Sequence, residues 1–196
     1  MKDHREWIAE LKKDIVFQTR LGGHDLVFHS TWGLFSPRSI DEGTALLFRH
    51  LAVKPDEHIF DLGCGYGPIG VGLAKMAPQG KVLMADKDYV AVEYANKNIV
   101  ANRIVNAEAI LSNGFSEVDE RKFDLVVSNV PAKVGKELLS IFLYDALDHL
   151  NPGGRIVVVT INGLRQFMKR NFNEVFGNYK KLKQGRNYTV SQAIKF

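Results

Sequence analysis

The chain has few of the features that mark secreted or membrane proteins. Its 196 residues include a single cysteine, Cys64, so no disulfide can form within the chain, and a reducing compartment fits. No stretch approaches the roughly 18 apolar residues of a membrane span. The most apolar runs, such as RIVVVT at 155–160, have the length of a strand. The charged N-terminus, MKDHREWIAELKKD, lacks the apolar segment of a signal peptide. We therefore expect a cytoplasmic protein with no membrane association.

Metal-binding patterns are also missing. None of the six histidines has metal-ligand spacing to another histidine or to the cysteine, so no metal is expected. Cys64 lies between two glycines and is interpreted as a small filler residue rather than a nucleophile. Phe142 is interpreted as a helix-packing residue.

Composition and charge describe an ordinary globular protein with a basic C-terminal part. Hydrophobic residues make up 45% and charged residues 24% of the chain, so a core can form without disulfides. The net charge is +4. Seven cations lie between residues 165 and 186, against one acid, Glu174. They indicate either a solvated surface or a face that contacts nucleic-acid phosphates: Arg165, Lys169, Arg170, Lys180, Lys181, Lys183 and Arg186.

The order of expected elements indicates an α/β fold. Residues 1–52 predict a helix at 1–13, a β-hairpin at 15–20 and 25–28, and a helix at 41–51. We expect this N-terminal extension to pack on a core domain, residues 53–196. In that core strands alternate with helices, which predicts a doubly wound, Rossmann-like, mostly parallel sheet. The expected strands are 58–61, 81–85, 107–111, 123–128 and 155–160, the helices are 69–76, 89–102, 136–150 and 164–172, and 179–182 and 188–194 form an antiparallel edge hairpin.

A glycine-rich turn follows the first strand of this core. The sequence reads IFDLGCGYGPIG, with Asp61 at the strand end, Gly63, Gly65 and Gly67 in the turn, and Pro68 at the expected helix start. A dinucleotide site has the pattern G-x-G-x-x-G, but here Pro68 stands where its third glycine belongs. Asp61 would repel a pyrophosphate and suits a cationic ligand. S-adenosylmethionine, with its amino group and sulfonium, is such a ligand.

Polar residues end the next two strands. Asp86 ends the strand 81–85 about 20 residues beyond the glycines, the usual place of a carboxylate that binds ribose hydroxyls. The alternative is that Asp86 caps the following helix, a role that Asp88 can take instead. Asn113 and Gly114 follow the third strand, where an Asn side chain can bind an adenine amino group; Asn-Gly is also a common turn.

These residues resemble the class I S-adenosylmethionine-dependent methyltransferases over residues 57–195. The segments GLFS at 33–36 and DEGT at 41–44 are similar to the small-domain group of ribosomal RNA guanine-N2 methyltransferases. The resemblance implies S-adenosylmethionine as the cofactor and an upstream segment that covers it. It also implies a single-domain member without the duplicated N-terminal domain of larger relatives. The expected cofactor-binding residues are Asp61, Gly63, Gly65, Gly67, Asp86, Lys87, Asn113, Gly114 and Asn129.

The loop after the fourth strand is similar to the Asn/Asp-Pro-Pro-aromatic loop of amino-group methyltransferases. In such a loop the Asn side chain and the carbonyl of the next residue hold the two hydrogens of a conjugated amine, while the aromatic ring stacks on the base. This chain has Asn129, Val130 and Pro131 as catalytic candidates, and Ala132 replaces the aromatic residue. The alternative for Asn129 is an ordinary turn residue at a strand end.

Three further residues are candidates for substrate binding. Phe35 is one of two rings, with Tyr66, that could replace the missing aromatic. Lys133 and Lys136 open the next helix and could meet RNA phosphates, or be solvated helix-start residues.

Three functions fit these residues. The first is an N-methyltransferase for guanine N2 in ribosomal RNA or the small ribosomal subunit. The second is a methyltransferase for a protein glutamine or a small amine, which the smaller residue at Ala132 favours. The third is a module that binds the cofactor without catalysis. RNA binding should weaken steeply with salt, which separates the first two functions.

Overall fold

A seven-stranded sheet forms the centre of the structure, a computed structural model that describes residues 3–131 and 134–196. The strand order is β5-β4-β3-β6-β7-β9-β8, and all neighbours are parallel except at β7–β9 and β9–β8. This confirms the predicted doubly wound sheet with an antiparallel edge hairpin. The strands are β3 (Ile59–Leu62), β4 (Val82–Asp86), β5 (Ala107–Leu111), β6 (Phe123–Asn129), β7 (Leu150–Ile161), β8 (Lys180–Gln184) and β9 (Tyr188–Ile194).

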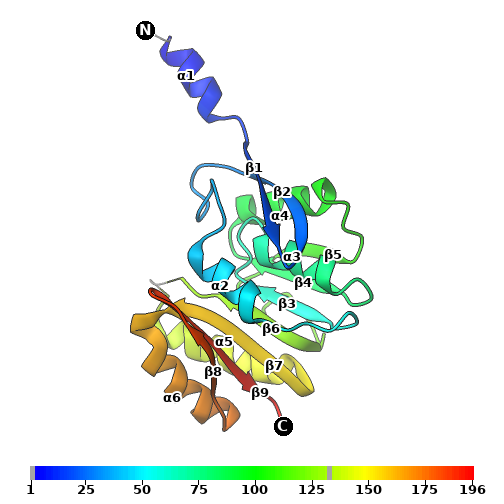
Figure 1. Ribbon diagram of the computed structural model, residues 1–196, viewed down its shortest axis with the longest axis vertical. Coiled ribbons are helices and arrows are strands. Elements are labelled where there is room, and N and C mark those ends of the chain that lie inside the picture. Colours follow the sequence, from blue (N-terminus) through cyan, green and yellow to red (C-terminus); the bar gives the residue numbers. More distant parts are fainter. Residues whose placement is uncertain (1–2, 132–133) are drawn as a thin grey trace.

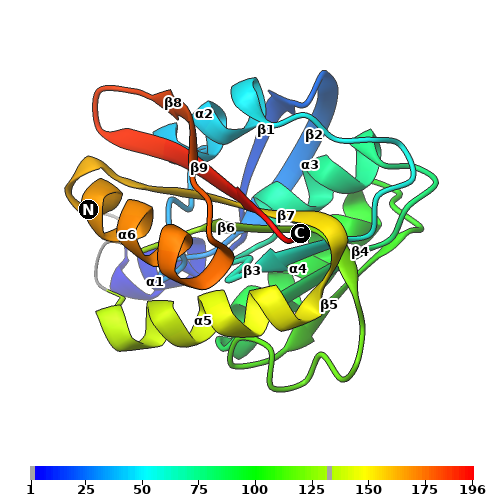
Figure 2. The same cartoon turned by 90° about the horizontal axis from the view of Figure 1, so that it is seen from below.

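Helices cover both faces of the sheet, and alternate residues of each central strand face opposite cores. Ile59 of β3 packs with the cluster that includes α2 (Glu42–His50), α3 (Pro68–Met76) and α4 (Tyr89–Ala101). Phe60 packs with the cluster of α5 (Lys136–His149) and α6 (Arg165–Phe176). Figure 2 shows α5 and α6 on one side of the sheet and α2 on the other. Both faces of the sheet are therefore buried, as expected for a parallel sheet.

Some element bounds differ from the expected ones. β7 begins at Leu150 rather than at residue 155, because Leu150 already pairs with Phe123 before the register shifts. A 3₁₀ turn, η1 (Asn162–Leu164), precedes α6, which continues to Phe176 and ends at Gly177 in the left-handed conformation. Gly177 stops the helix there because φ = +71° carries no steric penalty for glycine.

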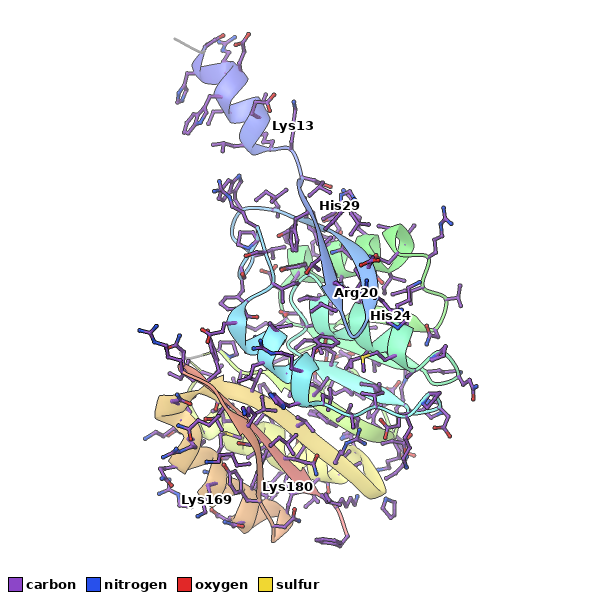
Figure 3. The ribbon with its side chains drawn as sticks, viewed as in Figure 1. Lys13, Arg20, His24, His29, Lys169 and Lys180 are labelled. Carbon is purple, nitrogen blue, oxygen red and sulfur yellow. The ribbon has the colours of Figure 1, made fainter. Side chains whose placement is uncertain are left out.

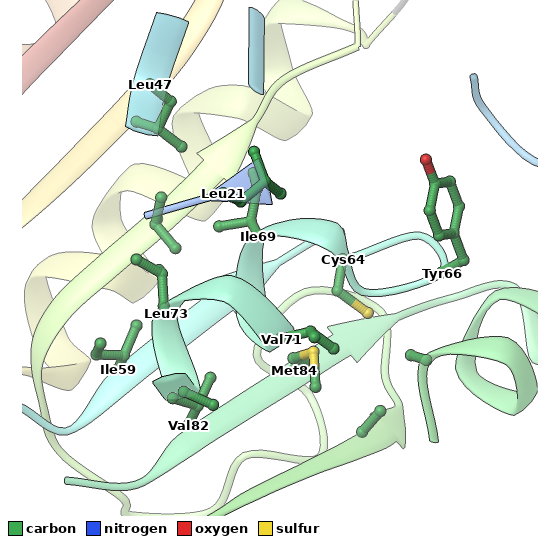
Figure 4. Packing of buried hydrophobic residues seen from close by; sticks show 14 of the residues in the cluster. Leu21, Leu47, Ile59, Cys64, Tyr66, Ile69, Val71, Leu73, Val82 and Met84 are labelled. Atoms are coloured by element: carbon green, nitrogen blue, oxygen red, sulfur yellow. The ribbon is translucent and has the colours of Figure 1, made fainter. Parts of the chain in front are cut away.

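The N-terminal part consists of a projecting helix and a hairpin. Helix α1 (His4–Leu11) buries none of its residues and extends away from the body (Figure 1). β1 (Ile15–Leu21) and β2 (His24–Ser30) form the predicted antiparallel hairpin. Its inward residues Leu21, Leu26 and Phe28 join the core cluster on the α3 side, part of which Figure 4 shows.

Two asparagine side chains, Asn98 on α4 and Asn102 at its C-cap, bind the edge of β2 as a neighbouring strand would. The Asn98 amide accepts from His29 N (2.7 Å) and donates to His29 O (2.8 Å). The Asn102 amide does the same with Val27 N (2.9 Å) and Val27 O (2.7 Å). Asn98 also donates to the carbonyl of Tyr66 in the glycine-rich turn (2.9 Å), so one buried side chain connects the hairpin to that turn.

Replacing Asn98 by alanine should be more destabilising than the same change at Asn102. Asn98 is fully buried, and its loss leaves three backbone groups without partners at a cost of about 1–3 kcal/mol each. Asn102 is only half-buried, so water can replace its bonds. Urea unfolding of Asn98→Ala and Asn102→Ala measures the two losses. An equal decrease in the free energy of unfolding in the two variants would contradict the role given to Asn98.

Candidate functional site

The glycine-rich turn leaves open space directly beyond β3. Gly63 and Gly65 have φ of +72° and +56°, and a Cβ atom at either would meet no atom within 4 Å. The turn is held against β4, since Gly63 N and Cys64 N both donate to the carbonyl of Ala85 (2.8 and 3.0 Å). Gly67 differs, because a Cβ there would press against α4. The backbone at Gly63 and Gly65 can thus contact a ligand closely.

Asp61 is a buried carboxyl with one unsatisfied oxygen. Its side chain is fully inaccessible, and Oδ2 accepts from Gly70 N at 2.7 Å. Oδ1 has no hydrogen-bond partner within the described part of the chain. Burial, together with the negative charge of Asp86, raises the pKa of Asp61 to about 7. A cation near Oδ1 would stabilise the ionised carboxylate.

Asp86 lies at the carboxyl end of β4, next to the glycine-rich turn. Its Oδ2 accepts from Gly65 N (2.8 Å) and its Oδ1 from Asp88 N (3.0 Å). The cap of α4 is Asp88, whose side chain accepts from Val90 N at 2.9 Å. Asp86 is therefore not the helix cap, and its carboxylate is held by the turn.

A cavity of about 170 Å³ opens beside these residues, between the carboxyl ends of β4, β5 and β6 and helix α5. Its lining contains seven of the residues expected from the sequence: Gly63, Asp86, Lys87, Asn113, Gly114, Val130 and Pro131. Most of the lining is apolar and includes Leu139, Phe142 and Met168. A mostly apolar cavity with a few polar groups suits an organic ligand such as a planar heterocycle.

Phe142 is a lining residue that the sequence interpretation missed. It was expected only to pack its helix, but it lines the cavity on the side of Gly114. A Cβ at Gly114 would lie 2.5 Å from the Phe142 ring, so glycine is required where ring and loop meet. The amphipathic pattern of α5 shows that Phe142 faces inward, but not that it faces a cavity.

Asn129, at the end of β6, is held in one orientation by α2. Its Nδ2 donates to Asp41 Oδ2 (2.9 Å) and to Thr44 Oγ1 (3.1 Å). Because the Asp41 carboxylate can only accept at neutral pH, the amide nitrogen must face α2. Asp41 also caps α2 through Gly43 N (2.8 Å). Both amide hydrogens of Asn129 are thereby used, and Oδ1 is its remaining polar atom.

The remaining substrate candidates are spread around this edge of the sheet. Phe35 is 67% exposed. Tyr66 is buried among aromatic rings and donates its hydroxyl to Ser36 O (3.1 Å), so it cannot stack on a substrate base. Lys136 lies over the Phe167 ring at 6.0 Å. Ala132 and Lys133 fall outside the described residues.

The basic segment lies on α6 and on the edge strand β8. Figure 3 shows Lys169 and Lys180 on these two elements, far from Lys13 at the other end of the molecule. Lys180, Lys181 and Lys183 belong to β8, where lysines also prevent edge-to-edge pairing with another sheet. Both interpretations of the basic residues, solvated surface and phosphate contact, thus have a physical basis.

The fold agrees with the comparisons with known proteins. Residues 25–192 match the family model of the methyltransferase small domain, and the chain belongs to this family. It is 34% identical over 142 residues to the protein YbxB of Bacillus subtilis, covering 71% of both chains. It is 32% identical over 165 residues to ribosomal RNA small subunit methyltransferase C of Hamiltonella defensa, covering 82% of this chain and 48% of that one.

A solved structure has the same fold. The T. thermophilus 16S rRNA N2 G1207 methyltransferase, in complex with AdoMet and guanosine, superposes with a TM-score of 0.83 at 29% identity. The match covers 92% of this chain and 50% of the other. The chain thus spans about half the length of the rRNA methyltransferases it matches. Of the helices described here, none is long and apolar enough to cross a membrane.

Replacing Asp61 by asparagine should stabilise the protein in a pH-dependent way. The folded-state pKa is raised from 3.8 to about 7, so the stability that Asp61 contributes falls as pH rises between these values. The difference in Tm between Asp61→Asn and the parent should therefore grow from pH 4 to pH 7 and stay constant above it. The full difference is on the order of 4 kcal/mol at most.

Thermal unfolding across this pH range is the measurement. Asp25→Asn, at an exposed carboxyl of β2, controls for a change of net charge. A difference that does not vary with pH would show that Asp61 titrates normally.

Proposed function

We propose that the chain is an S-adenosylmethionine-dependent N-methyltransferase that acts on the N2 amine of guanine in ribosomal RNA. The observation that carries the proposal is the Asn129 amide, fixed by Asp41 and Thr44 at the end of β6. The preceding strands β3 and β4 end in the open turn and carboxylates that suit the cofactor. The guanosine-bound T. thermophilus methyltransferase supports the substrate.

The residues of the site fit S-adenosylmethionine on three counts. Open space at Gly63 and Gly65 admits a ligand against the backbone. The unsatisfied Oδ1 of Asp61 suits a ligand with positive charge. In this proposal Asp86 would bind the ribose hydroxyls, and the cavity lined by Asp86, Asn113 and Gly114 would hold the adenine ring. When bound, the cofactor supplies a methyl group on a positively charged sulfur, which leaves as a neutral thioether.

The residues after β6 would orient the acceptor amine. Asn129 Oδ1 and the carbonyl of Val130 accept its two hydrogens, so that the nitrogen lone pair points away from them toward the methyl group. This lone pair would accept the methyl group of the bound cofactor, and the methylated amine would then lose a proton to water. No strong base is needed, because the proton leaves after attack. Catalysis then rests on positioning, which can supply several kcal/mol.

A methyltransferase for a protein glutamine or a small amine is the second candidate. The replacement of the aromatic residue by Ala132 favours it, because a non-planar acceptor needs no stacking ring. Exposed Phe35 can provide the stacking ring if the acceptor is a base. Lys136, and Lys133 outside the described residues, would contact phosphate in the RNA proposal.

Labelled methyl should pass from S-adenosylmethionine to unmodified ribosomal RNA or small subunits and be recovered as N2-methylguanosine after digestion. Asn129→Ala should lower kcat at least about 100-fold, since it removes an acceptor that aligns the amine. Calorimetry measures the affinity of the variant for S-adenosylmethionine separately, because Asn129 is also an expected cofactor-binding residue. Label in protein or in a small amine, with none in RNA, would favour the second candidate.

Thr44→Val should lower kcat about tenfold and leave the KM for the cofactor unchanged. Valine keeps the shape of the side chain but removes one of the two acceptors that orient Asn129. The loss should vanish in an Asn129→Ala background, because the hydroxyl acts through that amide. Glu42→Gln, on the same helical turn, is the matched control. Equal losses in both backgrounds would contradict a role through Asn129.

A further inference from the structure

The loop between β2 and α2 presents an aromatic ring and a cation together at the surface. Trp32 is 45% exposed, and the guanidinium carbon of Arg38 lies 4.6 Å from the centroid of its ring. Phe35, between them in the sequence, is the other exposed ring of the loop. An arginine stacked on tryptophan combines an apolar face with positive charge. The hydrophobic core does not explain this pair, since neither side chain is buried.

The loop that carries the pair is held in place. Leu34 is buried in the core, only 8% exposed. The Tyr66 hydroxyl donates to Ser36 O at 3.1 Å, and Ser36 Oγ donates to Ser39 O at 2.7 Å. Ser36 adopts φ = +48°, a conformation these bonds help to fix. An aromatic ring on an anchored loop loses little conformational entropy when a partner stacks on it.

The loop also leads directly into the proposed catalytic site. Arg38 precedes Asp41 by three residues, and Asp41 binds the Asn129 amide at 2.9 Å. The segment 38–41 therefore connects the Trp32–Arg38 pair to the carboxylate that orients Asn129. In Figure 1 the loop lies above the start of α2, on the same side as the end of β6.

We infer that Trp32 and Arg38 form a stacking platform for an unpaired nucleotide that flanks the methylated guanine in single-stranded RNA. This inference rests on the proposed function. A guanine must leave its base pair to expose its N2 amine, so its neighbours are unstacked as well. Every base has a π-face that can stack on indole, and the guanidinium pairs with the adjoining phosphate. A duplex offers the loop no free base face.

The chain permits a direct test, because it contains only two tryptophans, Trp7 and Trp32. Trp7 lies on the projecting helix α1 and is 48% exposed, close to the exposure of Trp32. Trp7→Phe leaves Trp32 as the sole indole emitter, and Trp32→Phe leaves Trp7. Titration with a single-stranded RNA oligonucleotide that contains guanine should quench Trp7→Phe saturably and leave Trp32→Phe nearly unchanged. The same oligonucleotide in duplex form should quench neither.

Kinetics give a second readout that separates this inference from the proposed function. Trp32→Ala and Arg38→Gln should each raise the KM for RNA about tenfold while kcat and the KM for S-adenosylmethionine stay constant. Trp32→Phe should recover part of the loss, and Trp7→Ala should behave as the parent. RNA methylation with an unchanged KM in Trp32→Ala, or equal quenching of both tryptophans, would overturn the platform alone. Failure of the parent protein to bind or methylate RNA would overturn both proposals.

Discussion

Burial of both faces of the parallel sheet is the constraint from which the site follows. Ile59 and Phe60 of β3 are fully inaccessible and face opposite cores, so the strand has no solvent-facing side on which to place chemistry. In β3 the one polar side chain, Asp61, therefore lies near the carboxyl end, and the carboxyl ends of parallel strands meet at one edge of the sheet. A polar group at such a position is buried at an energetic cost. The carboxyl of Asp61 is buried near the strand end, and one of its oxygens has no partner in the described chain.

The proposed site divides into a half assigned to the cofactor and a half assigned to the acceptor, and the two differ in electrostatics. Two carboxylates, Asp61 and Asp86, lie around the glycine-rich turn, and the charge of Asp86 adds to the rise in the pKa of Asp61. This half favours a cation. In the half assigned to the acceptor, the neutral amide of Asn129 is fixed by hydrogen bonds to the Asp41 carboxylate and the Thr44 hydroxyl. The Asp41 carboxylate thus both caps α2 and orients the Asn129 amide proposed to bind the amine.

Much of this could be predicted from the sequence because local patterns determine it. Strand and helix periods, the turn Gly63–Gly67 and the acids after successive strands each occupy a few consecutive residues. The contact between Asp41 and Asn129 could not be predicted, since 88 residues separate the partners. Phe142 was missed for a similar reason: an inward-facing ring on a helix looks the same whether it meets a core or a cavity. The roles assigned to the site residues, including Lys133 outside the described part of the chain, stay predictions.

The hydrogen bonds from the Asn98 and Asn102 side chains to the edge of β2 have a consequence for synthesis on the ribosome. The hairpin emerges early, but the side chains that complete its edge, Asn98 and Asn102, follow 69 and 75 residues after their partners. Until α4 has left the exit tunnel, the backbone groups of Val27 and His29 are open to pairing with another strand. A nascent chain stalled before residue 98 would thus expose unpaired backbone groups of β2, which could pair with a strand of another chain. In the folded protein the two asparagine side chains occupy these groups.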